Sequence, residues 1–193
     1  MNIVIIQYNA GNIQSVLYAL ERLGVQAMVT DNVELIQKAD KVIFPGVGEA
    51  STAMHYLKER GLDSVIQNLK QPVFGICLGM QLMCAYSEEN NTSCLGIFEE
   101  QVKLFKPTDS STKVPQIGWN TIGSLKTNLF KGVSEESYAY FVHGYYAALG
   151  AHTIATTQYI QPYSSALQKN NFYGVQFHPE KSAQHGLKLY QNF

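Results

Sequence analysis

The first half of the chain alternates short apolar runs with segments of helical periodicity, and this alternation limits what the chain can fold into. Each apolar run is four or five residues long, and three of the four are followed by apolar residues that recur every three or four positions. Strand–helix–strand units of this kind bury their strands in a parallel sheet. We therefore expect strands at 3–6, 25–29, 41–44 and 72–76, with helices at 13–24, 49–61 and 78–89.

The pattern changes from about residue 100. Runs of β-branched and aromatic residues, separated by turn residues, favour antiparallel strands there. Because no Pro-, Gly- or Ser-rich linker separates the two halves, we expect one α/β domain over residues 1–193 with a mixed, mostly parallel sheet. The runs lie at 101–105, 114–125, 137–146, 152–155, 164–168 and 172–177, with a polar loop at 106–113 and a final helix at 182–193.

Composition excludes several classes of protein. With 46% hydrophobic residues, 15% charged residues and a formal net charge of −1, the chain is not disordered and has no charge excess to attract nucleic acid or an anionic membrane. The apolar run at 3–6 is too short for a signal peptide or a membrane span. Three cysteines fit neither a disulfide framework nor a zinc site. We expect a cytoplasmic protein with no metal or cofactor, and a face covered by a partner is one explanation of so few charges.

The stretch 73–81 is the most informative for chemistry. It reads as an apolar strand, a G-x-C-x-G turn and a helix, so that Cys77 occupies a nucleophile elbow. Gly75 and Gly79 leave the room that so tight a turn needs. The helix N-terminus would stabilise a thiolate at Cys77, and the N–H of Leu78 would donate to an oxyanion. The alternative is a buried, inert cysteine.

A base for this thiol is available at His178. Pro179 biases His178 towards extended backbone, so that its ring leaves the preceding strand in a defined direction, and Glu180 is close enough to orient it. The carboxyl ends of neighbouring parallel strands share one crevice, which brings His178 towards Cys77. Taken alone, the three residues could equally form a surface turn.

Residues 44–49 end the third expected strand just before a helix. Gly46 and Gly48 let the backbone amides approach whatever sits in the crevice. Since Ser51 stands where a dinucleotide-binding loop has its third glycine, an oxyanion loop is the better interpretation.

Two further residues keep two interpretations each. His143 lies in an aromatic run and could be a core histidine or a ligand contact. Glu89 ends the helix expected at 78–89, where the dipole disfavours an acid, so it either grips an ammonium group or lies at a solvated helix end.

With these residues identified, GICLGMQ at 75–81 and GVQFHPEKS at 174–182 resemble the class I glutamine amidotransferases. Within that class, the motifs NAGNIQSV, FPGVG, VPQIGWN and YFVHGYY are similar, in order, to the glutaminase subunits of imidazole glycerol phosphate synthase. The resemblance covers essentially the whole chain. It implies an α/β fold with helices on both faces of the sheet, and glutamine as the substrate.

The resemblance also implies roles for individual residues. Cys77 would be the nucleophile, His178 the general base and then acid, and Glu180 the residue that orients His178. The PGVG segment would turn inward when the partner enzyme is loaded. The oxyanion donors would come from Leu78, Gly46, Val47 and Gly48, and the glutamine contacts from Gln81, Glu89, Gly144 and Tyr145.

The implied partner is a (β/α)₈ cyclase that joins the ammonia to a nucleotide and yields imidazole glycerol phosphate for histidine biosynthesis. The two chains would form a heterodimer. A paralogue that supplies ammonia to another synthase, for example one that amidinates a surface sugar, is an alternative, as are a standalone thiol hydrolase and a non-catalytic interaction module. Gln7 and Asn9 differ from the acidic residue and glycine usual in the family. The partner-facing positions would be Asn12, Trp119, Tyr140 and Lys181.

Overall fold

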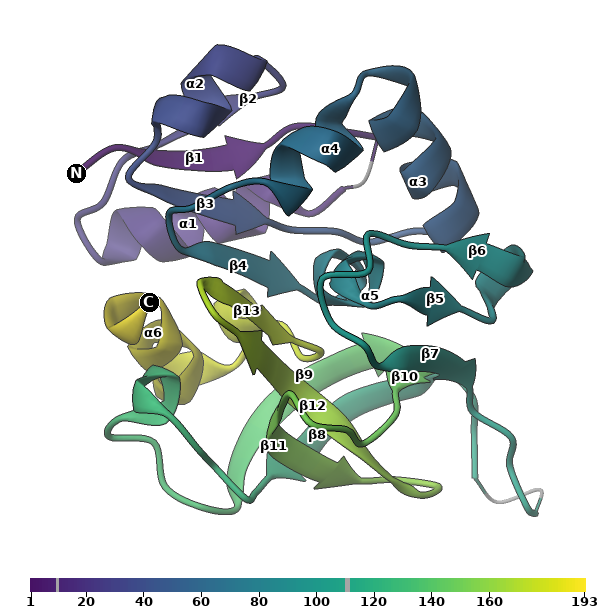
Figure 1. Cartoon of the computed structure of the whole chain (residues 1–193). Helices are drawn as coiled ribbons and strands as arrows, with labels where there is room; N and C mark the ends of the chain where they lie inside the picture. The colour runs from purple at the N-terminus through teal and green to yellow at the C-terminus, as the bar shows by residue number, and fades with distance from the viewer. Residues whose placement is uncertain (10, 110–111) are drawn as a thin grey trace.

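The computed structural model describes residues 1–9, 11–109 and 112–193, and a parallel sheet lies at its centre (Figure 1). Neighbouring strands in this part of the sheet run parallel. Every residue of β1 and β4 is buried, because helices cover both faces of the sheet and leave no polar side for an alternating pattern. The order is β2 (Ala27–Thr30), β1 (Ile3–Ile6), β3 (Lys41–Phe44), β4 (Val73–Ile76) and β13 (Phe172–Val175).

The second half of the chain extends this sheet with antiparallel pairs, as expected. β12 pairs antiparallel with β13, β11 and β10, and β10 pairs antiparallel with β7. At the edge, β7 pairs in parallel with β5 of a short hairpin, β5–β6. A separate two-stranded ribbon pairs β8 with β9. The strands are β5 (Tyr86–Ser87), β6 (Thr92–Ser93), β7 (Gln101–Leu104), β8 (Gln116–Ile122), β9 (Ser137–His143), β10 (Tyr145–Ala147), β11 (Thr153–Gln158) and β12 (Pro162–Lys169).

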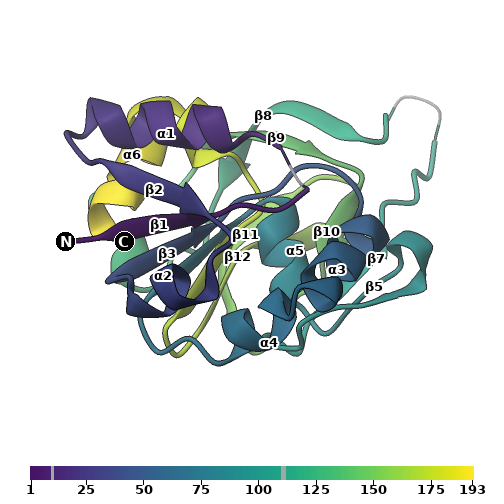
Figure 2. The ribbon, with the colours of Figure 1, turned by 90° about the horizontal axis from the view of Figure 1, so that it is seen from above.

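Helices cover both faces of the sheet, which confirms the expected fold class (Figure 2). α1 (Ile13–Arg22) and α6 (Ala183–Asn192) pack on one face, and their apolar residues share a buried cluster with β1, β4 and β13. The helices of the other face share a second buried cluster with residues of β1, β3 and β4. They are α2 (Val33–Lys38), α3 (Ala50–Glu59), α4 (Leu62–Gln67) and α5 (Leu78–Met83).

One expected helix is shorter than its sequence pattern suggests. The helix predicted at 78–89 ends at Met83, and Glu89 instead begins a short 3₁₀ turn, η1 (Glu89–Asn91). The returning chain explains the early end, because the N–H of Leu95 donates to the Leu82 carbonyl at 2.8 Å and that of Phe98 donates to the Met83 carbonyl at 2.9 Å. Carbonyls that would continue a helix are thus satisfied by a distant segment.

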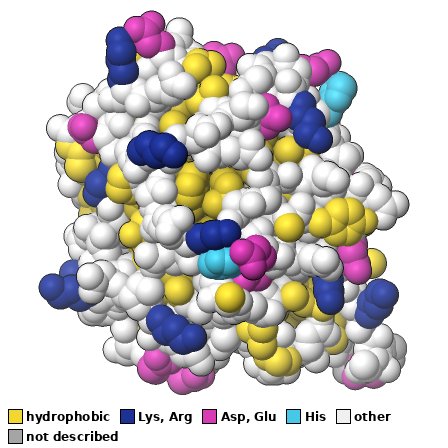
Figure 3. Space-filling view, viewed as in Figure 1, with side chains coloured by type: hydrophobic (Ala, Val, Ile, Leu, Met, Phe, Trp, Pro, Cys, Tyr) yellow, Lys and Arg dark blue, Asp and Glu magenta, His cyan; other side chains and the backbone are white. Residues whose placement is uncertain are grey.

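The surface agrees with the sparse charge of the sequence. On the face drawn in Figure 3, charged side chains of both signs are scattered among apolar and uncharged polar groups. Among the described residues, no helix is both long and apolar enough to cross a membrane. Two features of the sequence, Ala10 within the motif at 9–16 and positions 110–111 within the polar loop, lie outside the described residues.

Candidate active site

Cys77 lies at the strained turn between β4 and α5. Its backbone has φ 53° and ψ −111°, a left-handed φ that non-glycine residues rarely adopt. The Cys77 N–H donates to the Val175 carbonyl of the neighbouring strand at 2.8 Å, which fixes the turn to the sheet. A Cβ on Gly79 would lie 1.9 Å from the Phe44 carbonyl oxygen, so only glycine lets α5 start so close to β3. These features form a nucleophile elbow.

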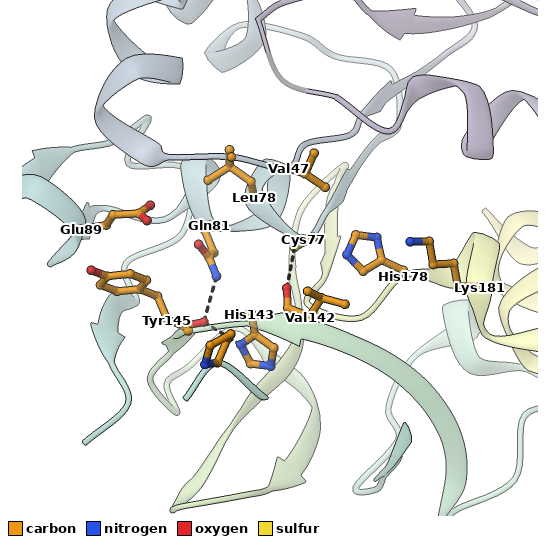
Figure 4. A pocket seen from close by; sticks show the side chains of 13 residues that line it. Val47, Cys77, Leu78, Gln81, Glu89, Val142, His143, Tyr145, His178 and Lys181 are labelled. Carbon is orange, nitrogen blue, oxygen red and sulfur yellow. Dashed lines mark hydrogen bonds between the residues drawn. The ribbon is translucent and has the colours of Figure 1, made fainter. Parts of the chain in front are cut away.

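His178 and Glu180 lie at the adjacent strand end, where the sequence predicts them. β13 pairs in parallel with β4 and ends at Val175, and the turn η3 (Pro179–Lys181) begins directly after His178. His178 Nδ1 lies 2.8 Å from Glu180 Oε1, and both side chains are almost completely buried. The bond to Glu180 uses Nδ1, so Nε2 is left to exchange a proton with Cys77. Figure 4 shows the His178 ring beside Cys77.

The electrostatics favour a charged imidazole at His178. Burial by itself lowers the pKa of His178, but the hydrogen bonds and negative charges of Cys77 and Glu180 outweigh it and raise the pKa to about 10. An imidazolium held between a thiolate and a carboxylate is the form that activates a cysteine nucleophile.

Asn12, which the sequence predicts to face a partner, also contacts a residue of the candidate active site. Its backbone is left-handed at φ 73°, and its side-chain amide donates to Glu180 Oε1 at 2.5 Å. Asn12 therefore holds the carboxylate that orients His178. The two residues are 168 positions apart in the sequence, so no local pattern indicates this contact.

A cavity of about 320 Å³ connects these residues with those predicted to bind glutamine. Figure 4 shows Cys77 and His178 on one side of the labelled group and Glu89 with Tyr145 on the other. Apart from Glu180 and the buried Gly46, the cavity brings the predicted catalytic, oxyanion and glutamine-binding residues together. It is lined by Val47, Gly48, Cys77, Leu78, Gln81, Glu89, Pro115, Val142, His143, Gly144, Tyr145, His178 and Lys181.

The far end of the cavity carries a carboxylate and an amide. Glu89 Oε2 accepts a hydrogen bond from the Ala50 N–H at 2.8 Å, and burial raises the pKa of the Glu89 carboxyl in spite of that bond. Gln81 donates its side-chain amide to the Tyr145 carbonyl at 3.0 Å. A cationic ligand would stabilise the charged form of a half-buried carboxylate such as Glu89. This favours the interpretation of Glu89 as an ammonium contact over that of a solvated helix end.

The loop at 44–49, which the sequence predicts to hold an oxyanion, has a defined orientation in this structure. The N–H of Leu78, predicted to donate to an oxyanion, instead donates to the Gly46 carbonyl at 3.2 Å. In a trans peptide the N–H points opposite to the carbonyl. Because the Gly46 carbonyl points towards Leu78, the Val47 N–H points away and does not face Cys77. Tyr8 holds the preceding peptide by donating to the Pro45 carbonyl at 2.6 Å, and burial keeps the pKa of its hydroxyl high. The predicted oxyanion donors Leu78 and Val47 would therefore both face Cys77 only after rotation of the Gly46–Val47 peptide.

The structure assigns a role to His143. Burial lowers the pKa of His143 to about 4, so the ring is neutral. Nδ1 lies 2.7 Å from the Tyr145 carbonyl and donates to it, while Nε2 lies 3.2 Å from the Tyr163 hydroxyl. His143 thus supports the predicted glutamine-binding backbone at Tyr145, a role that combines the two interpretations of the sequence.

Three of the residues predicted to face a partner are neighbours beside the cavity. Trp119 is 53% exposed, and its ring packs edge-on against Tyr140 at 5.7 Å between centroids. The ammonium group of Lys181 lies 5.9 Å from the Tyr140 ring centre, and Lys181 also lines the cavity. Exposed Trp119, half-buried Tyr140 and exposed Lys181 therefore lead from the ribbon β8–β9 to the cavity.

Comparisons with known proteins agree with this geometry. The family model for glutamine amidotransferase class-I matches residues 4–193. The imidazole glycerol phosphate synthase subunit HisH of Bacteroides fragilis is 58% identical over 193 residues, covering 100% of this chain and 98% of the relative. The HisH subunit of Pasteurella multocida is 47% identical and is covered over 96% of its length.

Solved structures support the fold alone. A putative GMP synthase subunit from Thermoplasma acidophilum superposes with a TM-score of 0.76 at 19% identity, over 100% of this chain and 92% of that one. The sequence relatives are far closer and match nearly end to end. The chain therefore belongs to the class I glutamine amidotransferases, and within them to the HisH subunits of imidazole glycerol phosphate synthase.

Proposed function

We propose that this chain is a glutaminase subunit that hydrolyses glutamine and supplies the ammonia to a cyclase in histidine biosynthesis. The observation that carries the proposal is one cavity in which the Cys77 elbow and the His178 ring face the amide of Gln81 and the carboxylate of Glu89. Thiol chemistry at one end and amino-acid recognition at the other suit glutamine.

The reaction has two halves in this proposal. Cys77 gives its proton to His178, and the thiolate attacks the side-chain amide carbon of glutamine. His178 then protonates the leaving nitrogen, which departs as ammonia and leaves a glutamyl thioester. Water deprotonated by His178 attacks the thioester and releases glutamate, and the proton returns to the sulfur. Glu180 holds the ring in the tautomer that both halves require.

Oxyanion stabilisation is the regulated part of this scheme. Leu78 supplies one N–H, and rotation of the Gly46–Val47 peptide frees it and turns the Val47 N–H inward as the second. Each oxyanion donor is worth about 10²–10³ in rate. Binding of a loaded partner would favour the rotated peptide.

The partner in the proposal is a (β/α)₈ cyclase bound as a heterodimer over Trp119, Tyr140 and Lys181. Ammonia released into water would be protonated and lose its nucleophilicity, so the cavity must open into a second protein. Residues 1–193 would act as one domain in the cytoplasm, where the free cysteines of the chain stay reduced.

The decisive experiment is glutamate release from glutamine, measured for the isolated chain and for the chain with the cyclase and its nucleotide ligand. We expect the loaded partner to accelerate release by about 10²–10³-fold, because it completes the oxyanion site. Equal rates in both samples would identify a standalone thiol hydrolase instead. Acceleration by a different synthase would identify a paralogue, and no glutamate in either sample would identify an interaction module.

Replacing Glu180 with glutamine should lower kcat in the complex by about 10²-fold, since a thiol depends less on its orienting group than a hydroxyl does. The change removes a negative charge that raises the pKa of His178. His178 then loses its proton at lower pH, so the alkaline limb of the pH profile of kcat/KM should move to lower pH. The pH profile of the variant measures this directly, and an alkaline limb that stays in place contradicts the assignment. Glu135→Gln, at an exposed carboxylate, is the control.

A further inference from the structure

Gln176 is a buried polar residue to which the sequence patterns assign no role. It follows β13 directly, two positions before His178, and is fully buried. Its side chain lies between Gln81 and Cys77, contacting the first at 2.9 Å and the second at 3.7 Å. The oxygen and the nitrogen of a buried side-chain amide both need hydrogen-bond partners. The neighbours of the Gln176 amide therefore show which of the two atoms faces Cys77.

One backbone carbonyl fixes that orientation. The Tyr145 carbonyl can only accept, so the Gln81 atom 3.0 Å from it is the amide nitrogen. The same nitrogen has a second proton, which it donates to Gln176 at 2.9 Å, so Gln176 presents its oxygen to Gln81. The Nε2 group of Gln176 must therefore face the sulfur of Cys77.

The sulfur has two different neighbours for its two protonation states. As a thiol, Cys77 donates to the Val142 carbonyl at 3.8 Å. As a thiolate it has nothing to donate, and a carbonyl oxygen beside it offers no stabilisation. The Gln176 N–H group is then a donor aimed at the negative charge, and hydrogen bonds to ionised groups are the strong ones.

We propose that Gln176 is a further catalytic residue, which donates a hydrogen bond to the Cys77 thiolate and is held in the donating orientation by Gln81. The thioester sulfur is a much weaker acceptor than the thiolate, so this bond forms most strongly when the sulfur carries charge. It assists formation of the nucleophile and also departure of the thiolate when water cleaves the thioester. Gln81 lines the cavity and is predicted to contact glutamine. Because it also orients Gln176, it would link glutamine binding to the nucleophile.

The test measures the thiolate without glutamine or a partner, so it does not depend on the proposed function. Gln176→Met has a similar length and no donor. We follow the rate of alkylation of Cys77 by iodoacetamide against pH, with mass spectrometry of the Cys77 peptide. We expect the midpoint of the pH profile to rise by about one unit, which is a tenfold change in the ionisation constant. Burial holds the pKa values of Cys84 and Cys94 high, so these thiols react slowly.

Controls separate this role from a structural one. Gln168→Met removes an amide from the half-buried β12 position away from the cavity and should leave the midpoint unchanged. Gln176→Glu keeps the shape of the side chain and, once ionised, places a negative charge at the sulfur, so its midpoint should rise at least as far. A midpoint unchanged in both folded Gln176 variants overturns the proposal, as does failure of both variants to fold, which would make Gln176 a structural residue.

In the complex with the cyclase, Gln176→Met should lower kcat for glutamine hydrolysis by about tenfold while KM changes by less than about twofold. A rise in KM with kcat unchanged would mean that Gln176 serves glutamine binding alone, against the proposal. If the midpoint of the alkylation profile shifts but even the native chain in the complex shows no glutaminase activity, the inference about Gln176 stands and the proposed function fails.

Discussion

Replacing Cys77 with serine should lower glutaminase kcat in the complex by about 10⁵-fold or more, while glutamine and the cyclase still bind. A serine hydroxyl is far less acidic than a thiol, so His178 deprotonates it much less readily than it deprotonates Cys77. The imidazolium at His178 also depends on the negative sulfur, because Cys77 raises the pKa of His178. Loss of the thiolate therefore removes the nucleophile and weakens the acid that protonates the leaving amide nitrogen.

The measurement is glutamate release in the presence of the loaded cyclase, together with calorimetric binding of the cyclase to the variant. Cys94→Ser is the matched control, since that thiol donates to the Thr92 carbonyl at 3.6 Å and lies outside the cavity. The control should keep full activity. A Cys77→Ser variant that retains more than a small fraction of the native rate would remove Cys77 from the mechanism.

The sequence predicts the elbow and the His178 pair well because both depend on local requirements. A G-x-C-x-G turn between an apolar run and a helix has few other uses, and Pro179 restricts the backbone of His178. The parallel strand pattern then brings the two segments together without any knowledge of side-chain contacts. The placement of side chains at the ends of parallel strands can therefore be predicted from residue type and position.

Other parts of the site depend on contacts between distant segments. The helix after Cys77 ends early because residues 95–98 take its last carbonyls, and the periodicity of 78–89 contains no sign of this. Asn12 reaches Glu180 across the fold. The orientation of the Gly46–Val47 peptide cannot be predicted at all, because glycine permits both orientations and the choice depends on Leu78 and Tyr8. Gln176 has no signal beyond its place just after β13, two positions before His178.

Gly79→Ala should damage both the fold and the site, because the glycine lies where α5 meets β3. The new Cβ would lie 1.9 Å from the Phe44 carbonyl oxygen and 2.9 Å from its carbon, and these are backbone atoms of a buried strand that cannot rotate away. Either α5 moves, or the end of β3 does. Overpacking of this kind costs about 3 kcal/mol, which for a chain of this size lowers the melting temperature by about 6–12 °C.

The same displacement should lower activity, because both moving segments carry the chemistry. α5 begins immediately after Cys77, and Phe44 leads directly into the oxyanion loop, so a shift between them changes the distance from the sulfur to the oxyanion donors. A misplacement of about 1 Å costs about 10²-fold in rate. Thermal unfolding and glutamate release in the complex measure the two effects. Gly144→Ala is the control for stability, since its Cβ would meet Val114 at an ordinary 3.7 Å. An alanine at position 79 that changed neither quantity would mean that the close approach of α5 to β3 does not hold the nucleophile in place.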